Sequence, residues 1–326
     1  MMAHAFFNLA GATLCLESTD PALLAPLRLL LGSLETDQAR GKTTQWSVAH
    51  GMVPPLPQDE ILFHGRFPGL DGDCTLAGSG EHLVLTLEEQ VHIEFDRLRG
   101  RGAILVAQGA ERILAGDIGM SIVDAAIDMT GQTLVHGAAL AVPHRDRAIL
   151  VFAPSGTGKT TTALALSASG FALMSDDVGV LRRDGAGLEI WGLPRKPKVH
   201  RRTAALLPWL LPHLHGDWDN EGEQVIRPED VPEIAIAAPA AALPLAGLIW
   251  LRPHRQGATI METADKPELL VALAADNLRR ARSGTPDYQM DRFELFSSMV
   301  RNVPSFTLAV GDRLDGVAAV LSARLA

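Results

Sequence analysis

Cysteine and aromatic residues are scarce in this chain of 326 residues. The two cysteines, Cys15 and Cys74, are too few for a disulfide framework or a four-thiolate metal site, and free thiols are typical of a reducing cytosol. We therefore expect a cytoplasmic protein. Aromatic residues make up only 5% of the chain, but apolar residues make up 47%, so a sizeable core can form and a disordered chain is excluded.

Basic residues are outnumbered by acidic ones. The 29 lysines and arginines against 38 aspartates and glutamates give a net charge of −9. An acidic protein repels a polyphosphate backbone, so we expect no general binding to nucleic acid. Any anion that the protein binds must be held by a local group of donors.

A basic leader and an unbroken apolar run are also missing. The first residues lack the positive charges of a signal peptide, and Asn8 interrupts their apolar run, which predicts a strand. The longest uncharged stretch, residues 234–251, contains Pro239 and Pro244 and is therefore a poor candidate for a membrane helix. We expect no membrane span, and a buried strand over 245–251.

The apolar periodicity changes character near residue 130, which predicts two domains. Residues 1–130 favour a smaller α+β domain, with strands over 6–16, 45–48 and 61–63, a strand pair over 82–95, and helices over 21–31 and 117–129. Residues 131–326 favour an α/β domain with a mixed sheet, which ends with helices over 267–283, 289–302 and 312–325 and a strand over 305–310. The first domain contains no motif that indicates its role.

The strongest motif is a glycine-rich loop between a strand that starts at Arg147 and a helix of small residues. It begins at Ala153, where many Walker A loops have glycine, and predicts a phosphate site. Glycines let the backbone wrap a phosphate, while the lysine supplies a cation and the next hydroxyl can reach Mg²⁺. The predicted nucleotide-binding residues are Ser155, Gly156, Thr157, Gly158, Lys159, Thr160 and Thr161.

Two adjacent aspartates follow this loop at a distance that brings the chain back to it. The helix from Lys159 to Ser169 carries the chain away by about 15 Å, at ~1.5 Å per residue. A strand over 171–175 returns it by about 16 Å, at ~3.3 Å per residue. Asp176 and Asp177 are therefore predicted to lie at the loop, where one carboxylate can hold Mg²⁺ and the other can face an incoming hydroxyl. The alternative is a solvated acidic turn.

His136 is predicted to face the same loop from an antiparallel hairpin. Residues 132–142 and 147–153 flank a polar turn, and with the turn centred near Arg145, residue 136 lies opposite residue 154. A lone histidine on a strand can equally be a structural residue.

With His136 and Gly137, the loop, the acid pair and the segment Leu188-Glu-Ile-Trp-Gly192, the chain resembles the catalytic domain of HPr kinase/phosphorylase. More broadly, it resembles the HPr-kinase-like serine kinases of the phosphoenolpyruvate-carboxykinase-type P-loop fold. The resemblance is specific over residues 130–192. It implies that Asp176 is the general base on a substrate hydroxyl, that Asp177 and Glu189 help Thr160 hold Mg²⁺, and that His136 and Lys159 complete the catalytic set.

After Gly192 the chain departs from that family. It continues with the basic run 194–202, in which Arg195, Lys196 and Lys198 are candidates to contact an acidic substrate or the transferred phosphoryl group. A solvated basic loop is the alternative. This departure argues against HPr as the substrate. In this respect the chain resembles divergent members of the group that modify peptides or small molecules. The histidines and aspartates of 213–219 lie in a segment typical of a loop and do not predict a metal site.

These features together predict an ATP-dependent, Mg²⁺-dependent kinase that phosphorylates a serine-type hydroxyl of a peptide or protein. Two alternatives remain open. One is a small-molecule kinase of the same fold, and the other is a nucleotide-binding regulator or ATPase without an acceptor. A homo-oligomer is compatible with the sequence.

Overall fold

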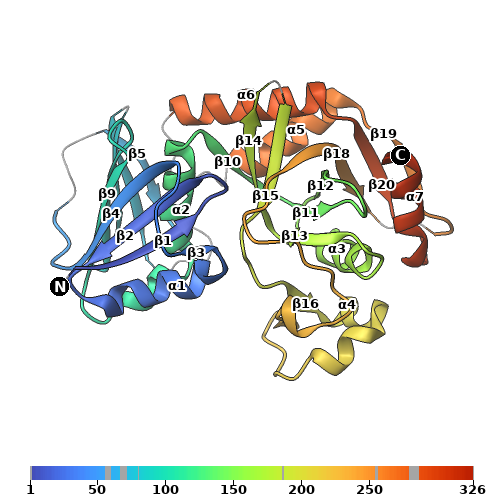
Figure 1. Ribbon diagram of the computed structural model, residues 1–326, viewed down its shortest axis with the longest axis horizontal. Helices are drawn as coiled ribbons and strands as arrows, with labels where there is room; N and C mark the ends of the chain where they lie inside the picture. Colours follow the sequence, from blue (N-terminus) through green and yellow to red (C-terminus); the bar gives the residue numbers. More distant parts are fainter. Residues whose placement is uncertain are drawn as a thin grey trace. The chain divides into compact units, whose positions relative to one another are not determined.

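The computed structural model describes residues 2–55, 60–66, 72–79, 81–185, 187–253, 256–278 and 286–325, which form a mixed α/β protein with large mixed sheets (Figure 1). The chain divides into two compact units. Unit 1 contains Met1–Thr133 and Ala281–Arg292, and unit 2 contains Leu134–Arg280 and Phe293–Ala326. The sequence placed one boundary after residue 130; the units change at Thr133, and a segment from the C-terminal third joins unit 1.

Unit 1 is built on a sheet with the strand order β3-β1-β2-β4-β9-β8-β7-β6-β5. β2, β4 and β9 are parallel neighbours. The strands are β1 (Ala3–Asn8), β2 (Ala12–Ser18), β3 (Glu35–Thr36), β4 (Lys42–His50), β5 (Ile61–Gly65), β6 (Cys74–Ser79), β7 (His82–Leu87), β8 (Val91–Asp96) and β9 (Arg101–Val106). The helical segments are η1 (Pro21–Leu24), α1 (Ala25–Leu31), η2 (Gly32–Leu34), η3 (Glu111–Ala115) and α2 (Asp117–Met129).

The predicted strand pair over 82–95 is confirmed, because β7 and β8 are antiparallel with Leu85 opposite Ile93. The single strand predicted over 6–16 is wrong. The chain turns at Ala10 and Gly11, whose φ angles are +54° and +94°, and returns as β2 against β1. The turn could not be predicted from the periodicity, because the residues on both sides of it are apolar.

A buried ion-pair cluster explains why a late segment joins unit 1. Arg292 lies on α6 (Pro286–Asn302), and its guanidinium donates to Asp124 at 2.7 Å and Asp128 at 2.5 Å, both on α2. All three residues are buried. Breaking such a group leaves uncompensated charge in the interior, so these contacts hold the first part of α6 to α2.

Unit 2 contains a second mixed sheet with the order β10-β14-β15-β18-β12-β11-β13, and β20 lies beside β18 and β19. Its strands are β10 (Gln132–His136), β11 (Ala138–Ala141), β12 (Ala148–Phe152), β13 (Ala172–Ser175), β14 (Val178–Asp184), β15 (Gly187–Gly192), β18 (Leu243–Arg252), β19 (Ile260–Thr263) and β20 (Ser305–Ala309). The helices around it are α3 (Lys159–Ser167), α5 (Lys266–Asn277), the second part of α6, and α7 (Asp315–Leu325). A separate small sheet pairs β16 (Lys198–His200) with β17 (Glu223–Val225) beside α4 (Arg201–Leu206), η4 (Pro208–His213) and η5 (Pro228–Asp230).

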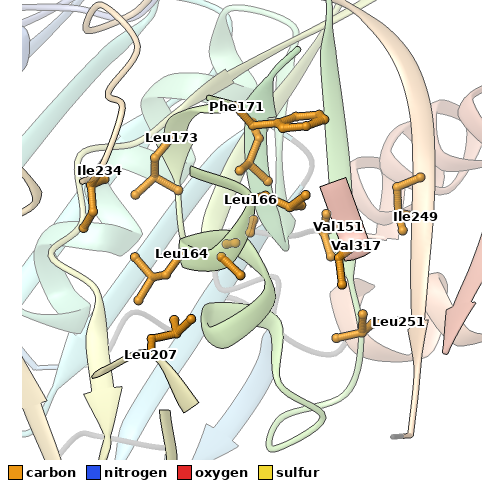
Figure 2. Packing of buried hydrophobic residues seen from close by; sticks show 14 of the residues in the cluster. Val151, Leu164, Leu166, Phe171, Leu173, Leu207, Ile234, Ile249, Leu251 and Val317 are labelled. Carbon is orange, nitrogen blue, oxygen red and sulfur yellow. The ribbon is translucent and has the colours of Figure 1, made fainter. Parts of the chain in front are cut away.

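Both faces of the central strands in unit 2 are covered. Ile149 and Val151 of β12 point to a cluster with α3 and α7, whereas Leu150 and Phe152 point to a cluster with α5 and α6. Figure 2 shows the first cluster, in which Leu166 and Val317 lie near Val151. A strand that is buried on both faces forms a continuous apolar run. The run Ala148–Phe152 is therefore a central strand, and the glycine-rich loop follows it directly.

The C-terminal predictions are confirmed with different bounds. α5 ends at Asn277, and the rest of the predicted helix 267–283 lies largely outside the described residues. α6 and β20 correspond to the predicted helix 289–302 and strand 305–310, and α7 starts at Asp315. The stretch 245–251 lies in β18. Among the helices of the described part, none has the length and apolar character to cross a membrane.

Candidate active site

The glycine-rich loop connects β12 to α3 and turns with two residues in the left-handed region. Gly156 has φ +79° and Gly158 has φ +103°. A Cβ on either would meet nothing within 4 Å, so the backbone conformation alone requires glycine. The Thr157 hydroxyl donates to the Pro154 carbonyl oxygen at 2.8 Å, and the Lys159 ammonium donates to the Ala153 carbonyl oxygen at 2.8 Å. The lysine is thereby folded back over the loop.

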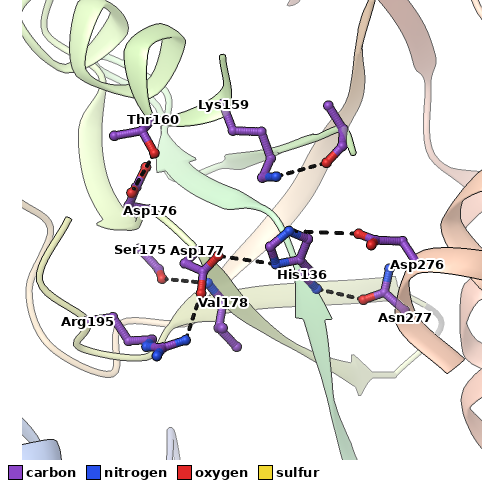
Figure 3. Close-up of polar contacts among 11 residues, drawn as sticks. His136, Lys159, Thr160, Ser175, Asp176, Asp177, Val178, Arg195, Asp276 and Asn277 are labelled. Carbon is purple, nitrogen blue, oxygen red and sulfur yellow. Dashed lines mark hydrogen bonds and ion pairs between the residues drawn. The ribbon is translucent and has the colours of Figure 1, made fainter. Parts of the chain in front are cut away.

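The chain returns to this loop after α3, as the segment lengths predicted. Gly170 (φ +96°) follows the end of the helix, and β13 runs back along β11 to Ser175. The Thr160 hydroxyl then donates to Asp176 Oδ2 at 2.9 Å (Figure 3). Asp176 is 5% exposed, and its other oxygen, Oδ1, is buried without a hydrogen-bond partner in the described part of the chain.

Asp177 is held by the side chains of His136 and Arg195. Its Oδ1 lies 3.2 Å from His136 Nδ1, and its Oδ2 accepts from Arg195 at 2.7 Å (Figure 3). The Asp177 carbonyl oxygen accepts from the Gly137 amide at 2.9 Å. A Cβ at Gly137 would lie 2.7 Å from Leu150 and 2.9 Å from the Val151 carbonyl oxygen, so this close approach requires glycine.

The predicted antiparallel hairpin forms between β11 and β12, but His136 lies outside it. The antiparallel register of β11 and β12 places Ala138 opposite Val151, and the strand is interrupted at Gly137. His136 belongs to β10, which lies next to β14, so residue 136 does not lie opposite residue 154. Its imidazole nonetheless lies beside Asp177, and the neighbouring Gly137 amide donates to the Asp177 carbonyl oxygen.

Two residues that the sequence did not single out support His136 from the end of α5. The Asn277 side-chain oxygen accepts from the His136 amide at 2.6 Å, and its nitrogen donates to the Leu273 carbonyl oxygen at 2.9 Å. Asp276 Oδ2 lies 3.8 Å from His136 Nε2. The imidazole therefore lies between two carboxylates, Asp177 and Asp276 (Figure 3).

The two adjacent aspartates have opposite pKa shifts. Burial raises the pKa of Asp176 to about 7, and the negative charge of Asp177 adds to this, against the Thr160 hydrogen bond and the charges of Lys159 and Arg195. Burial also raises the pKa of Asp177, but the hydrogen bond and charge of His136, with the charges of Arg195 and Lys159, outweigh it and hold that pKa at about 2. Such separated values are typical of functional sites.

A cavity of about 860 Å³ lies in front of these residues, within the size range of small-molecule sites. Of the predicted site residues, Thr157 and Glu189 are not among those that line it. Its walls comprise His136, Ser155, Gly156, Gly158, Lys159, Thr160, Thr161, Asp176, Asp177, Arg195, Lys196, Lys198, His200, Arg202, Thr203, Leu206 and Glu223. The structure thus brings the loop, the acid pair, His136 and the three predicted basic residues to one place.

Glu189 lies elsewhere. Strand pairing places it directly opposite Arg182, and its carboxylate accepts from the Arg182 guanidinium at 2.7 and 2.6 Å. The structure does not bring it to the acid pair, so it drops out of the set of candidate metal ligands. Only the family resemblance implied that Glu189 is a metal ligand, and the register of β14 and β15 pairs it with Arg182 instead.

The second wall of the cavity comes from β16, β17 and α4. Lys198 Nζ lies 3.3 Å from Glu223 Oε2 across the small sheet, and the hydroxyls of Thr161 and Thr203 are 2.7 Å apart. The latter contact joins α4 to the first turn of α3. The sequence identified the basic run but not its anchors, because Thr203 and Glu223 carry no local signal of such a role.

The segment 213–219 contributes nothing to the cavity. His213 lies 3.5 Å from Glu233, and Asp219 accepts from the backbone amides of Glu221 and Glu223. Within the described residues there is no group of three or more His, Cys, Asp or Glu side chains that could hold a metal ion.

Magnesium needs fewer protein ligands than such a group, because it takes one or two carboxylates together with phosphate oxygens and water. The acid pair beside the Thr160 hydroxyl offers only oxygen donors, and the unpartnered Oδ1 of Asp176 is a buried acceptor that lacks a ligand. The oxygen donors of Thr160 and Asp177 fit a Mg²⁺-bound phosphate, and Asp176 Oδ1 faces the same place as a buried acceptor. A loop with a lysine, a hydroxyl and paired carboxylates can hold a polyphosphate and receive a proton beside it.

No protein-family model matches this chain, and the curated proteins contain no match to it either. The function is therefore inferred from the geometry of the site.

Proposed function

We propose that this protein is an ATP-dependent kinase of the HPr-kinase-like P-loop type, which transfers the γ-phosphoryl group to a serine-type hydroxyl of a peptide or protein. The observation that carries the proposal is the 2.9 Å hydrogen bond between the Thr160 hydroxyl and Asp176 at the mouth of the glycine-rich loop. It supports a site in which a phosphate-binding helix start and a buried acid meet within one cavity.

The loop side of the cavity would bind the triphosphate. The backbone amides at the N-terminus of α3 offer donors, and Lys159, which donates to the Ala153 carbonyl oxygen, adds a positive charge beside them. The Thr160 hydroxyl and Asp177, whose pKa is lowered, would hold Mg²⁺, which would neutralise charge on the phosphates.

Asp176 would act as the general base. Its Oδ1 is buried and unpartnered, and a pKa of about 7 suits a group that must accept a proton near neutral pH. In the transfer, the acceptor oxygen forms a bond to the γ-phosphorus, the bond from that phosphorus to the bridging oxygen breaks, and ADP leaves. The acceptor proton goes to Asp176. His136 would keep Asp177 ionised and oriented through its 3.2 Å contact.

Phosphoryl transfer from γ-labelled ATP to candidate serine peptides, followed by mass spectrometry, tests the proposal. We expect phosphopeptide and ADP to form together, and Asp176→Asn to abolish transfer while nucleotide affinity is retained. Asp184→Asn, an exposed aspartate at the end of β14, is the matched control. If Asp176→Asn loses Mg²⁺-dependent nucleotide binding, Asp176 is the metal ligand and Asp177 is the base. If transfer is unchanged in Asp176→Asn, Asp176 has no role in the mechanism.

A small-molecule kinase is the second candidate, because most of the described residues that line the cavity are of polar or charged types. Leu206 is the only large apolar side chain among the described residues that line it. Phosphorylated amino acids or sugars in the same assay would favour this function. Release of ADP at the same rate without any acceptor would instead favour a nucleotide-binding ATPase.

A further inference from the structure

The cavity has a charge balance opposite to that of the chain. The protein carries a net charge of −9, yet the basic residues that line the cavity outnumber the acidic ones. The basic set is Lys159, Arg195, Lys196, Lys198 and Arg202, and the acidic set is Asp176, Asp177 and Glu223. A cationic cleft in an acidic protein concentrates anionic ligands there.

Three of the five cations already have a partner in the site. Arg195 pairs with Asp177 at 2.7 Å, and Lys198 pairs with Glu223 at 3.3 Å. Lys159 lies on the glycine-rich loop. The side chains of Lys196 and Arg202 make no hydrogen bond or ion pair within the residues that the structure describes.

Both unpaired cations stand on an anchored wall. Next to Lys196, the Pro197 carbonyl oxygen accepts from the Ile226 amide at 3.0 Å, and next to Arg202, the buried Thr203 hydroxyl contacts Thr161 at 2.7 Å. Between them Val199 is fully buried. Their backbone is thus fixed relative to α3, and the two charges face the same cavity as the loop.

From this charge balance we infer that the acceptor carries a second, anionic group, a carboxylate, and that Lys196 and Arg202 bind it on the wall formed by β16 and α4. The inference rests on the proposed kinase function. The loop amides, Lys159 and Mg²⁺ would neutralise the triphosphate, which leaves these two cations for another ligand. Arginine binds a carboxylate or phosphate through two parallel hydrogen bonds, and lysine adds a point charge, so the pair selects for an oxyanion near the hydroxyl.

Matched acceptors test the inference. One pair consists of capped tetrapeptides in which the serine is flanked by glutamate or by glutamine. The other consists of glycerate and its amide. Comparison of the two pairs shows whether the anionic group belongs to a peptide or to a small molecule. Binding is measured by calorimetry with Mg²⁺ and a non-hydrolysable ATP analogue present, and transfer is measured with ATP. The variants are Lys196→Gln, Arg202→Gln and the double variant, with exposed Arg183→Gln as control.

We expect wild type and Arg183→Gln to prefer the acidic member of at least one pair by about tenfold, with a preference that declines as salt increases. The double variant should lose this preference while its nucleotide affinity stays within about twofold of wild type. Equal binding of acidic and neutral acceptors to wild type would overturn the inference and leave the kinase proposal intact. A large loss of nucleotide affinity in the double variant would overturn it too, because the two cations would then serve the nucleotide.

Failure of the kinase proposal gives a different result. If the acidic probes bind through Lys196 and Arg202 but no probe is phosphorylated in any assay, the anion site stands and its assignment to a phosphoryl acceptor is overturned.

Discussion

Asp176→Asn should make the metal-free protein more stable, because burial disfavours the ionised Asp176 carboxylate. The carboxyl is 5% exposed and is paired only with Thr160 on one side, so its ionised form is disfavoured by burial. Asparagine has nearly the same shape as the neutral acid and keeps an oxygen that can accept from Thr160. The substitution therefore removes a buried charge without removing the hydrogen bond, at the expense of the base.

The magnitude follows from the pKa of about 7 in the folded protein against about 3.9 in an unfolded chain. Between these values the unfolded state is more ionised than the folded state, so the wild type loses stability as pH rises through this window. Asparagine cannot ionise, and its advantage grows over the same range. At ~1.4 kcal/mol per pKa unit, the gain in unfolding free energy is roughly 1–2 kcal/mol at pH 5 and about 4 kcal/mol at pH 8.

Urea denaturation with EDTA at the two pH values measures this gain. Tryptophan fluorescence follows it well, because four of the five tryptophans, Trp191, Trp209, Trp218 and Trp250, lie in unit 2. Asp184→Asn, which removes an exposed charge, should change stability by less than about 0.5 kcal/mol at either pH. The pKa of Asp177 is about 2, so its titration falls below the window. An Asp176→Asn gain that is absent, or equal at both pH values, would refute the reasoning.

Three further substitutions test other parts of the site. Asn277→Ala removes a buried acceptor from the His136 amide and should lower the unfolding free energy by ~1–3 kcal/mol in urea, whereas the exposed Asn302→Ala should change it little. Gly158→Ala forces φ +103° on a residue with a Cβ, so it should lower the unfolding free energy by ~1–2 kcal/mol and weaken nucleotide affinity measured by calorimetry. Gly185→Ala (φ +55°) is the control, which should lower the unfolding free energy but leave nucleotide affinity unchanged. Glu189→Gln should leave Mg²⁺-dependent nucleotide affinity at the wild-type value, and a loss would return Glu189 to the metal site.

The position of Asp176 could be predicted because it depends on local lengths. A helix of known rise and a strand of known rise follow each other, and Gly170 marks the reversal between them. Both elements lie within a short stretch of chain, so no long-range pairing enters the prediction. The same holds for Gly156 and Gly158, whose positive φ is a property of the loop itself.

Features that depend on distant pairing could not be predicted. Asn277 contacts His136 across 141 positions of sequence, and an asparagine at the end of a helix carries no signal of that partner. Glu189 faces Arg182 because of a strand register that the resemblance did not contain. Arg292 belongs to unit 1 because two aspartates of α2 pair with it, which no periodicity of α6 reveals. Apolar patterns locate elements, but polar partners depend on the tertiary arrangement.

A crystal structure of the protein with Mg²⁺ and a non-hydrolysable ATP analogue tests the central claim most directly. We predict a triphosphate on the amides of residues 156–160, with Lys159 turned from Ala153 toward it and Asp176 facing the γ-phosphoryl group across the cavity. A nucleotide bound outside this cavity, or an Asp176 carboxylate that faces away from the γ-phosphoryl group, would contradict the account.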